Sequence, residues 1–265
     1  MPAERKPVQL TAAELRRQRL KARERFLRGR RVESDYAQAL RSVAKQVGAI
    51  VRGFVKTDNL SASIAQVREH LNRYAELLNP WAKAVATKMV AEVARKDASA
   101  WAEHGRTMGR ALHREIATAP TGEALRGLLG EQVTLITSLP RRASERVHEL
   151  TIKGITEATR AEDLVSKILK TGKVTESQAM TIARTEVTRT ASALTMVRAE
   201  HVGAEGYIWR TALDSDVRPL HRHLEGQFIR FDNPPIAGED GERAHAGMIY
   251  NCRCFMEPVI PDVIQ

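Results

Sequence analysis

Apolar side chains recur at steps of three and four residues along the chain as far as Gly203, which is the spacing of one face of an α-helix. The clearest stripe spans residues 34–55 and consists of Tyr36, Leu40, Val43, Val47, Ile50 and Val51. An earlier helix is predicted over residues 11–28, because Thr11 and Glu14 form a capping box. Further helices are expected over residues 60–78, 80–104, 105–118, 121–136, 141–158, 160–170 and 175–202. Pro120, the run Ser138–Leu139–Pro140 and Gly172 mark boundaries between them.

The pattern changes after Gly203. Residues 207–211 and 227–231 are rich in β-branched and aromatic side chains and predict two short strands. The tail contains Pro258 and Pro261, and we expect it to be extended. The sequence therefore predicts an α+β protein with a mainly α-helical body and a small β-containing C-terminal module. Three regions are expected: a basic N-terminal helical arm over residues 1–34, a helical body over 35–174, and a module of one long helix plus short strands over 175–265.

Composition agrees with a folded helical protein. Hydrophobic residues make up 43% of the 265 residues, enough for a packed core, and aromatic residues only 5%, which disfavours a sandwich or barrel. No run of about 18 apolar residues occurs, so no membrane-spanning helix is expected. The N-terminal residues are charged and lack the apolar segment of a secretory signal. We therefore expect a protein that stays in the cytosol of the cell that makes it.

The positive charge is concentrated at the N-terminus. The formal net charge of the chain is +10, and residues 1–34 account for +7, with eleven basic and four acidic side chains. Such an arm is typical of a segment that contacts a polyanion or an acidic partner, although a solvated charged helix would show the same pattern. The candidate DNA or portal contacts are Arg16, Arg17, Arg19, Lys21, Arg23, Arg25, Arg28, Arg30 and Arg31.

The only two cysteines, Cys252 and Cys254, are separated by one residue. A disulfide between them would close a small strained ring, so they are better candidates for metal ligands or for small buried side chains. With His221 and His245 they would form a Cys₂His₂ set suited to a structural zinc ion. In the alternative interpretation the two thiols pack as small apolar groups, and His221 hydrogen-bonds Asp214 or a loop carbonyl.

Four short motifs occur in order near the C-terminus: Ala183–Glu186 (ARTE), Trp209–Asp214 (WRTALD), Arg218–Gly226 (RPLHRHLEG) and Asn251–Cys254 (NCRC). In these motifs the chain resembles the Mu F-like minor head proteins, or head morphogenesis proteins, of tailed bacteriophages. The resemblance is specific over about residues 175–258 and weaker back to about residue 80. Some relatives have C-P-x-C where this chain has Arg218–His221, which suggests a metal-binding knuckle in part of the family; here Arg218 replaces the first cysteine.

The resemblance implies a structural, non-enzymatic virion protein, present in few copies near the portal vertex inside the head. It implies roles in procapsid assembly and in packaging or ejection of DNA. The implied partners are the portal protein, a major capsid or scaffolding protein, and double-stranded DNA, with no membrane. During assembly the protein would be in the host cytoplasm.

No catalytic residue is assigned in this interpretation. The residues expected to hold the module together are Arg184, Glu186, Trp209, Asp214, Arg218 and Gly226. Arg184 and Glu186 are expected to be a structural ion pair that joins the long helix to the module. The alternative is a metal-dependent nucleic-acid-processing enzyme such as a nuclease. His245 and Asn251 are similar to a His-Asn nuclease arrangement, but the final metal-ligand histidine of that motif is missing after Asn251.

Overall fold

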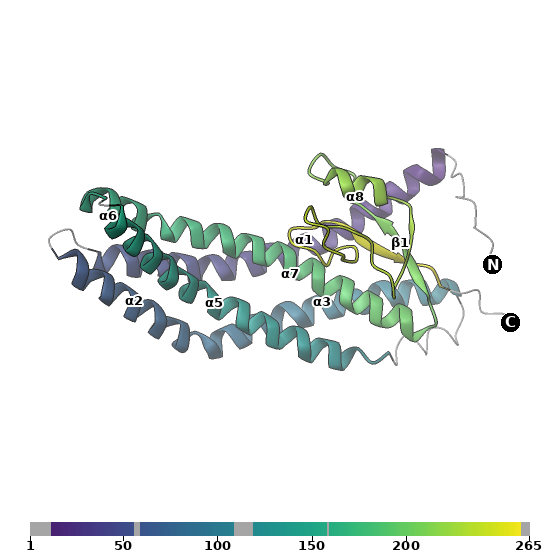
Figure 1. Ribbon diagram of the computed structural model, residues 1–265. Coiled ribbons are helices and arrows are strands. Elements are labelled where there is room, and N and C mark those ends of the chain that lie inside the picture. Colours follow the sequence, from purple (N-terminus) through teal and green to yellow (C-terminus); the bar gives the residue numbers. More distant parts are fainter. Residues whose placement is uncertain (1–11, 56–58, 109–118, 158, 261–265) are drawn as a thin grey trace.

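The computed structural model describes the backbone of residues 12–55, 59–108, 119–157 and 159–260. It describes the side chains of residues 30–55, 59–102, 119–157 and 159–260. The predicted fold class is confirmed: a long helical bundle carries a small three-stranded sheet near its C-terminal end (Figure 1). Among the described residues, no helix combines the length and the apolar character needed to cross a lipid bilayer.

The bundle is built from helices that run back and forth along its length (Figure 1). Helix α1 (Ala12–Phe54) packs along α7 (Thr171–His201), its most extensive partner. Helices α2 (Leu60–Leu77) and α3 (Asn79–Met108) follow one another end to end, and both pack against α5 (Thr121–Thr156). The short helix α6 (Ala161–Leu169) lies at the far end of the bundle and returns the chain into α7.

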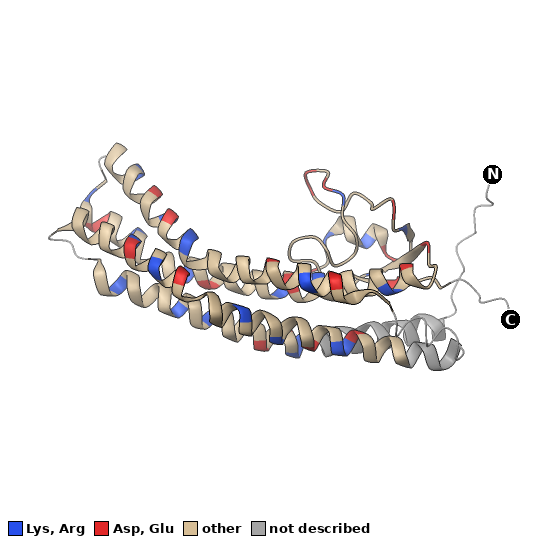
Figure 2. Cartoon of the chain, turned by 90° about the horizontal axis from the view of Figure 1, so that it is seen from below, with Lys and Arg blue, Asp and Glu red and all other residues tan. Residues whose placement is uncertain are grey.

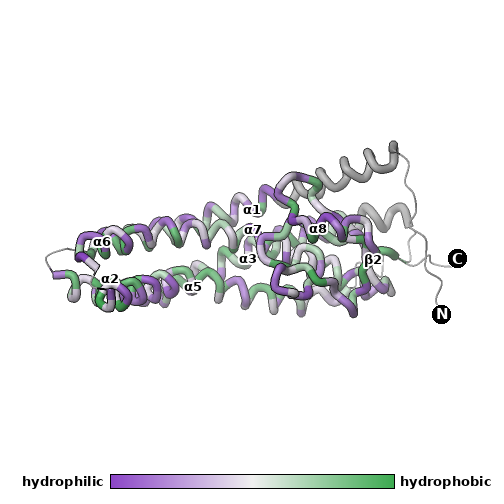
Figure 3. The backbone as a smooth tube through the Cα atoms, turned by 45° about the horizontal axis from the view of Figure 1, so that its top comes forward, coloured by the Kyte–Doolittle hydropathy of each residue, from purple (hydrophilic) through white to green (hydrophobic). Residues whose placement is uncertain are grey.

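The predicted apolar stripes form the core. Tyr36, Leu40, Val43, Val47 and Val51 of α1 are all buried, as the spacing predicts. Figure 3 shows hydrophobic and hydrophilic positions alternating along the bundle helices, and Figure 2 shows basic and acidic positions interspersed along them. Burying one such side chain contributes about 1.5–3 kcal/mol, so tertiary packing of these stripes is the main stabilisation of the long helices.

The predicted break between residues 28 and 34 is wrong, because α1 continues without interruption from Ala12 to Phe54. Gly29 is the weakest helix former there, and a single glycine is tolerated inside a helix. Val32 and Tyr36 on either side of Ser34 are buried in the bundle, which favours continuation of the helix. The division of the chain into three regions stays a prediction, but α1 crosses its first boundary.

Two other expected boundaries also differ: the one at Pro140 is wrong, and the one expected at Gly172 falls at Lys170, between α6 and α7. Pro140 lies inside α5 rather than between two helices, and Ile136, Leu139 and Pro140 are all buried. The burial of this turn outweighs the backbone hydrogen bond that proline cannot make. Gly172 lies in the first turn of α7, where it allows close contact with α1: a Cβ added at Gly172 would lie 2.9 Å from the Cα of Gly48.

The C-terminal module contains an antiparallel sheet with strand order β2-β1-β3. Strands β1 (Gly206–Arg210) and β2 (Phe228–Arg230) correspond to the two predicted strands. The third strand, β3 (Phe255–Pro258), was expected only to be extended, and it pairs with β1 in the register Trp209 to Met256. The short helix α8 (Pro219–Leu224) precedes β2.

The core of the module is continuous with the end of the bundle. Trp101 of α3 and Ala199 of α7 belong to the same buried cluster as Tyr207 and Trp209 of β1. Strand β3 also packs directly against α7. The module is therefore fastened to the bundle by shared apolar packing.

Candidate functional site

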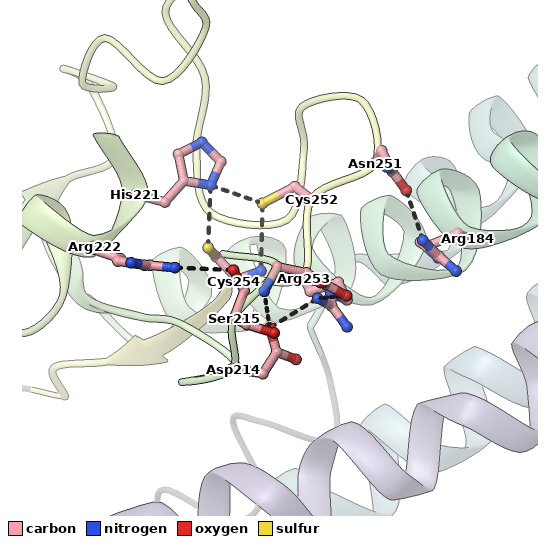
Figure 4. A network of polar contacts seen from close by, with 10 residues as sticks. Arg184, Asp214, Ser215, His221, Arg222, Asn251, Cys252, Arg253 and Cys254 are labelled. Atoms are coloured by element: carbon pink, nitrogen blue, oxygen red, sulfur yellow. Dashed lines mark hydrogen bonds and ion pairs between the residues drawn. The ribbon is translucent and has the colours of Figure 1, made fainter. Parts of the chain in front are cut away.

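His221, Cys252 and Cys254 meet at the centre of the module (Figure 4). His221 comes from α8, and the two cysteines come from the segment that leads into β3. The His221 Nδ1 atom lies 3.6 Å from the Sγ of Cys252 and 3.4 Å from the Sγ of Cys254. All three side chains are buried, and the three donor atoms lie within 4.8 Å of one another.

The second ring nitrogen of His221 determines how the ring faces the sulfurs. Its Nε2 donates to the carbonyl of Ala237 at 2.9 Å. Because a carbonyl can only accept, Nε2 carries a proton, and Nδ1 is the ring nitrogen that faces the two sulfurs. A backbone carbonyl that orients a histidine in this way is a common second partner of metal-binding imidazoles.

The two thiols share a proton unequally. The hydrogen bond between them, supported by His221, lowers the pKa of Cys252 well below that of a free thiol. The same hydrogen bond, together with burial, raises the pKa of Cys254. Burial lowers the pKa of His221, but its hydrogen bonds to Cys252 and Ala237 outweigh burial and raise it. A thiolate beside an imidazole is the donor chemistry that a zinc ion takes.

The three donors also fit zinc in spacing. Tetrahedral coordination with bonds of about 2.0–2.3 Å places neighbouring donor atoms roughly 3.5 Å apart. The two nitrogen-to-sulfur distances, 3.4 and 3.6 Å, match that separation. The structure thus brings together three of the four residues expected to bind metal.

His245, the fourth expected ligand, lies in a different hydrogen-bond chain. Its Nε2 is 3.1 Å from the carbonyl of Phe231, and its Nδ1 is 3.2 Å from the hydroxyl of Tyr207. That hydroxyl also accepts from the backbone N–H of Ala246. Burial lowers the pKa of His245, so the ring is neutral and acts as a link between strands and loop.

Trp209 forms one wall of the cluster. Its indole is fully buried and meets the His221 ring edge-on at a centroid distance of 5.4 Å. Tyr207 is also fully buried. Both rings therefore lie in the module core and present no surface on which a base could stack.

The motif residue Gly226 completes a turn beside β1. Gly226 has φ of +80° and donates its N–H to the carbonyl of Trp209. The neighbouring Glu225 accepts from both the N–H and the hydroxyl of Thr211, and it also lies 3.3 Å from Arg210. The role of Glu225 was missed, although it lies inside a quoted motif.

Asp214 and Arg253 join the second motif to the fourth (Figure 4). The Oδ1 atom of Asp214 lies 2.8 Å from Nη2 of Arg253, and Asp216 also lies 2.8 Å from that guanidinium. Asp214 is thus paired with arginine and does not bond His221. Arg218 donates to the carbonyl of Tyr250 at 3.0 Å, so it ties α8 to the loop before Cys252.

The expected ion pair between Arg184 and Glu186 is wrong. Residues two apart on a helix point about 200° away from each other, so these side chains serve opposite faces of α7. Arg184 donates to Oδ1 of Asn251 at 3.2 Å and lies 3.4 Å from Glu33 of α1. It therefore does join the long helix to the module, but through Asn251.

Glu186 points into the bundle instead. Its carboxylate accepts from Nε2 of Gln132 at 2.6 Å, and the Oε1 of Gln132 accepts from the hydroxyl of Tyr36 at 2.9 Å. Burial raises the pKa of Glu186 above its ordinary value, despite the opposing bond from Gln132 and the charge of Arg189. Each of the three side chains comes from a different helix, α1, α5 or α7, so their spacing in the sequence does not indicate that they meet.

Thr185 makes a contact between two motifs that sequence reasoning did not assign. Its hydroxyl accepts from the N–H of Asn251 at 2.9 Å, so two consecutive residues of the ARTE motif hold the NCRC motif. Asn251 has φ of +53°, a left-handed conformation that asparagine tolerates. These contacts explain why the two motifs occur together.

The candidate DNA or portal contacts from Arg16 to Arg28 have side chains outside the described residues. Arg30 and Arg31 are described and exposed. The backbone of the segment from Ala12 belongs to the continuous helix α1. The assignment of these residues to DNA or portal contact therefore stays a prediction.

Comparison with known proteins confirms the resemblance. Residues 145–257 match the family described as Phage Mu protein F like protein, and this range includes all four motifs. The chain is also 33% identical over 138 residues to an uncharacterized protein of Haemophilus influenzae. That alignment covers 52% of this chain and 30% of the relative, so the chain spans about a third of the relative's length. No solved structure matches the chain.

Proposed function

We propose that the protein is a minor head protein of a tailed bacteriophage that acts in head morphogenesis as a scaffold, without catalytic turnover. The observation that carries this proposal is the match of residues 145–257 to the Mu F-like family. We place it in the head interior near the portal vertex, with the portal and a capsid or scaffolding protein as partners.

The motif contacts support a scaffolding role. Arg184, Thr185, Asp214 and Arg218 all bond the segment from Tyr250 to Arg253. Each of these polar groups holds one element of the module against another, which is what a rigid adaptor requires. In this proposal the family motifs specify a shape that is presented to a partner.

The DNA part of the proposal rests on the basic arm. Helix α1 has 43 residues, which corresponds to a rod of about 65 Å. Its N-terminal part extends beyond the sheet in Figure 1. If the arm neutralises about six phosphates, the logarithm of the affinity for duplex DNA should fall with the logarithm of salt concentration with a slope near −5. A truncation that tests this should stop before Val32, which is buried.

We further propose that His221, Cys252 and Cys254 hold a structural zinc ion. Zinc would join α8 to the segment before β3 in a module whose apolar core is small. Three protein donors leave one of the four tetrahedral positions open, so an open position does not separate the two functions. The competing function, a metal-dependent nuclease, would in addition need a general base beside the metal. A zinc analysis combined with a nuclease assay on the purified full chain separates the two.

The decisive experiment asks where the protein is found. Purified mature phage particles and immature heads are analysed by quantitative mass spectrometry, and the purified chain is sedimented with the cognate portal oligomer. We expect the chain in the particles at a few copies and in the portal fraction. Absence from both particle types, or metal-dependent cleavage of DNA by the purified chain, would overturn the proposal.

A further inference from the structure

We propose that the module docks onto an acidic protein surface through Leu213, Arg218, Arg222 and Tyr250, which we call the Arg218–Tyr250 patch. This inference rests on the proposed function, since it names the surface that a head or portal partner contacts. It also states the chemistry of that partner: carboxylates next to apolar side chains.

Two guanidiniums of the patch are held in place without a carboxylate. Arg218 donates to the carbonyl of Tyr250 at 3.0 Å, and Arg222 donates to the carbonyl of Ser215 at 2.9 Å. The two arginines lie one helical turn apart, because the N–H of Arg222 donates to the carbonyl of Arg218. Within the described part of the chain, neither has an ion pair with an acidic side chain.

The neighbouring Arg253 shows the contrast. It lies 2.8 Å from both Asp214 and Asp216, so one guanidinium faces two carboxylates there. A carbonyl bond fixes the position of a guanidinium but leaves its charge uncompensated. Arg218 and Arg222 therefore present two oriented guanidiniums, and the three arginines and two aspartates together keep a net positive charge, which favours an incoming carboxylate.

The apolar part of the patch lies on the two loops whose carbonyls bond these arginines, the loop with Ser215 and the loop with Tyr250. The side chains of Leu213 and Tyr250 are 50% and 63% exposed. The Asp214–Arg253 pair (Figure 4) ties the loop with Leu213 to the loop with Tyr250. Arg218 also donates to the carbonyl of Tyr250. Exposed tyrosine and arginine on a rigid frame are the residue types that dominate binding energy at protein interfaces.

Leu213 has a backbone conformation that folding alone does not favour. Its φ is +57°, in the left-handed region where a leucine is strained and a glycine is not. Its side chain gains little in return from packing, since half of it is exposed. Strain of this kind in an exposed, rigid loop is typical of residues retained for binding.

A protein partner fits these residues better than DNA does. Protein interfaces are enriched in tyrosine, arginine and apolar side chains at their centre. Protein–DNA interfaces are more polar, so Leu213 would gain little there. Because the loops are already bonded to one another, little conformational freedom is lost when the partner binds.

The test compares three variants of the full chain. Arg218→Glu combined with Arg222→Glu reverses the two charges, and Leu213→Gly removes the side chain while relieving the strained backbone. Arg243→Glu is the matched control, because Arg243 is another exposed module arginine bonded to Asn233 and Pro234. The probes are the purified portal oligomer and the capsid protein of the same phage, and a 30-base-pair duplex.

We expect the double charge reversal to weaken binding to the portal or capsid protein about tenfold or more. Leu213→Gly should weaken binding about fivefold while its thermal unfolding midpoint is unchanged or higher, because glycine suits a positive φ. A purely structural role for Leu213 would change stability and affinity in the same direction. Arg243→Glu should bind within about twofold of the wild type.

The outcomes separate the two proposals. If the wild-type chain binds neither protein, the proposed function fails, and the patch proposal fails with it. If the wild type binds and the patch variants bind equally well, or Arg243→Glu weakens binding as much, only the patch proposal is overturned. Loss of duplex binding in the double variant with unchanged protein binding would also overturn it, since the charges would then serve phosphate.

Discussion

The carboxylate of Asp97 on α3 lies 2.7 Å from Nε of Arg198 on α7, and the two side chains are only 7% and 10% exposed. The hydroxyl of Thr195 bonds the same carboxylate. This buried pair connects two helices just where the module core meets the bundle, beside Trp101. The two residues are 101 positions apart in sequence, so no local sequence motif identifies them as a pair.

Removing one member of this pair should be costly. We expect Asp97→Ala to lower the free energy of unfolding by about 3–5 kcal/mol, because it leaves a buried guanidinium without its carboxylate. Replacing both partners, as in Asp97→Leu with Arg198→Met, should cost clearly less. Urea unfolding monitored by circular dichroism measures both values. Equal losses in the single and double variants would show that packing, and not charge, determines the effect.

Gly172 and Gly130 should respond oppositely to alanine. A Cβ at Gly172 would lie 2.9 Å from the Cα of Gly48, so Gly172→Ala forces α1 and α7 apart and should destabilise the protein by about 1–3 kcal/mol. A Cβ at Gly130 meets nothing within 4 Å, so Gly130→Ala should stabilise helix α5 by about 0.5–1 kcal/mol. The thermal unfolding midpoints of the two variants measure these changes in stability. A higher midpoint for Gly172→Ala would contradict the close approach of α1 and α7.

Glu186 should make stability depend on pH. Its pKa in the folded protein is raised above the ordinary value of 4.5, mainly by burial. The folded state therefore binds this proton more tightly than the unfolded state, and stability should decrease as the pH rises through the interval between the two pKa values. Glu186→Gln removes this term while keeping an oxygen that can accept from Gln132.

The measurement is the difference in unfolding free energy between Glu186→Gln and the wild type from pH 3 to 8. The free energy of unfolding of the variant should rise relative to that of the wild type as the pH rises above about 4.5. The difference should become constant above the raised pKa of Glu186. A flat difference for Glu186→Gln would contradict the raised pKa.

Metal content should distinguish His221 from His245. His221→Ala, Cys252→Ser and Cys254→Ser are each expected to lose bound zinc, because each removes one of the three clustered donors. His245→Gln should retain zinc, although it breaks the bonds to Phe231 and Tyr207 and should lower stability by about 1–3 kcal/mol. Elemental analysis measures the bound zinc of each variant, and a thiol-reactivity assay shows whether the remaining cysteines are still protected. Zinc loss in His245→Gln alone would overturn the three-donor site.

Much of the local structure follows from the sequence. The apolar stripe from Tyr36 to Val51 identifies a helix and its buried face, and the β-branched run after Gly203 identifies β1. Helix ends were less well predicted, because Gly29, Pro140 and Gly172 are local breakers whose effect depends on packing. The motifs and the resemblance they carry were also present in the residue order, and residues 145–257 match the family.

What only the tertiary structure decided is which side chains meet. His221 and His245 are equally plausible ligands by residue type, but Ala237 orients one toward the thiols and Phe231 holds the other away. Arg184 and Glu186 are neighbours in sequence, yet they contact Asn251 and Gln132 on opposite sides of α7. Periodicity records which face of an element is buried, a property of consecutive residues. Long-range contacts depend on how separate elements pack, and no local pattern encodes that.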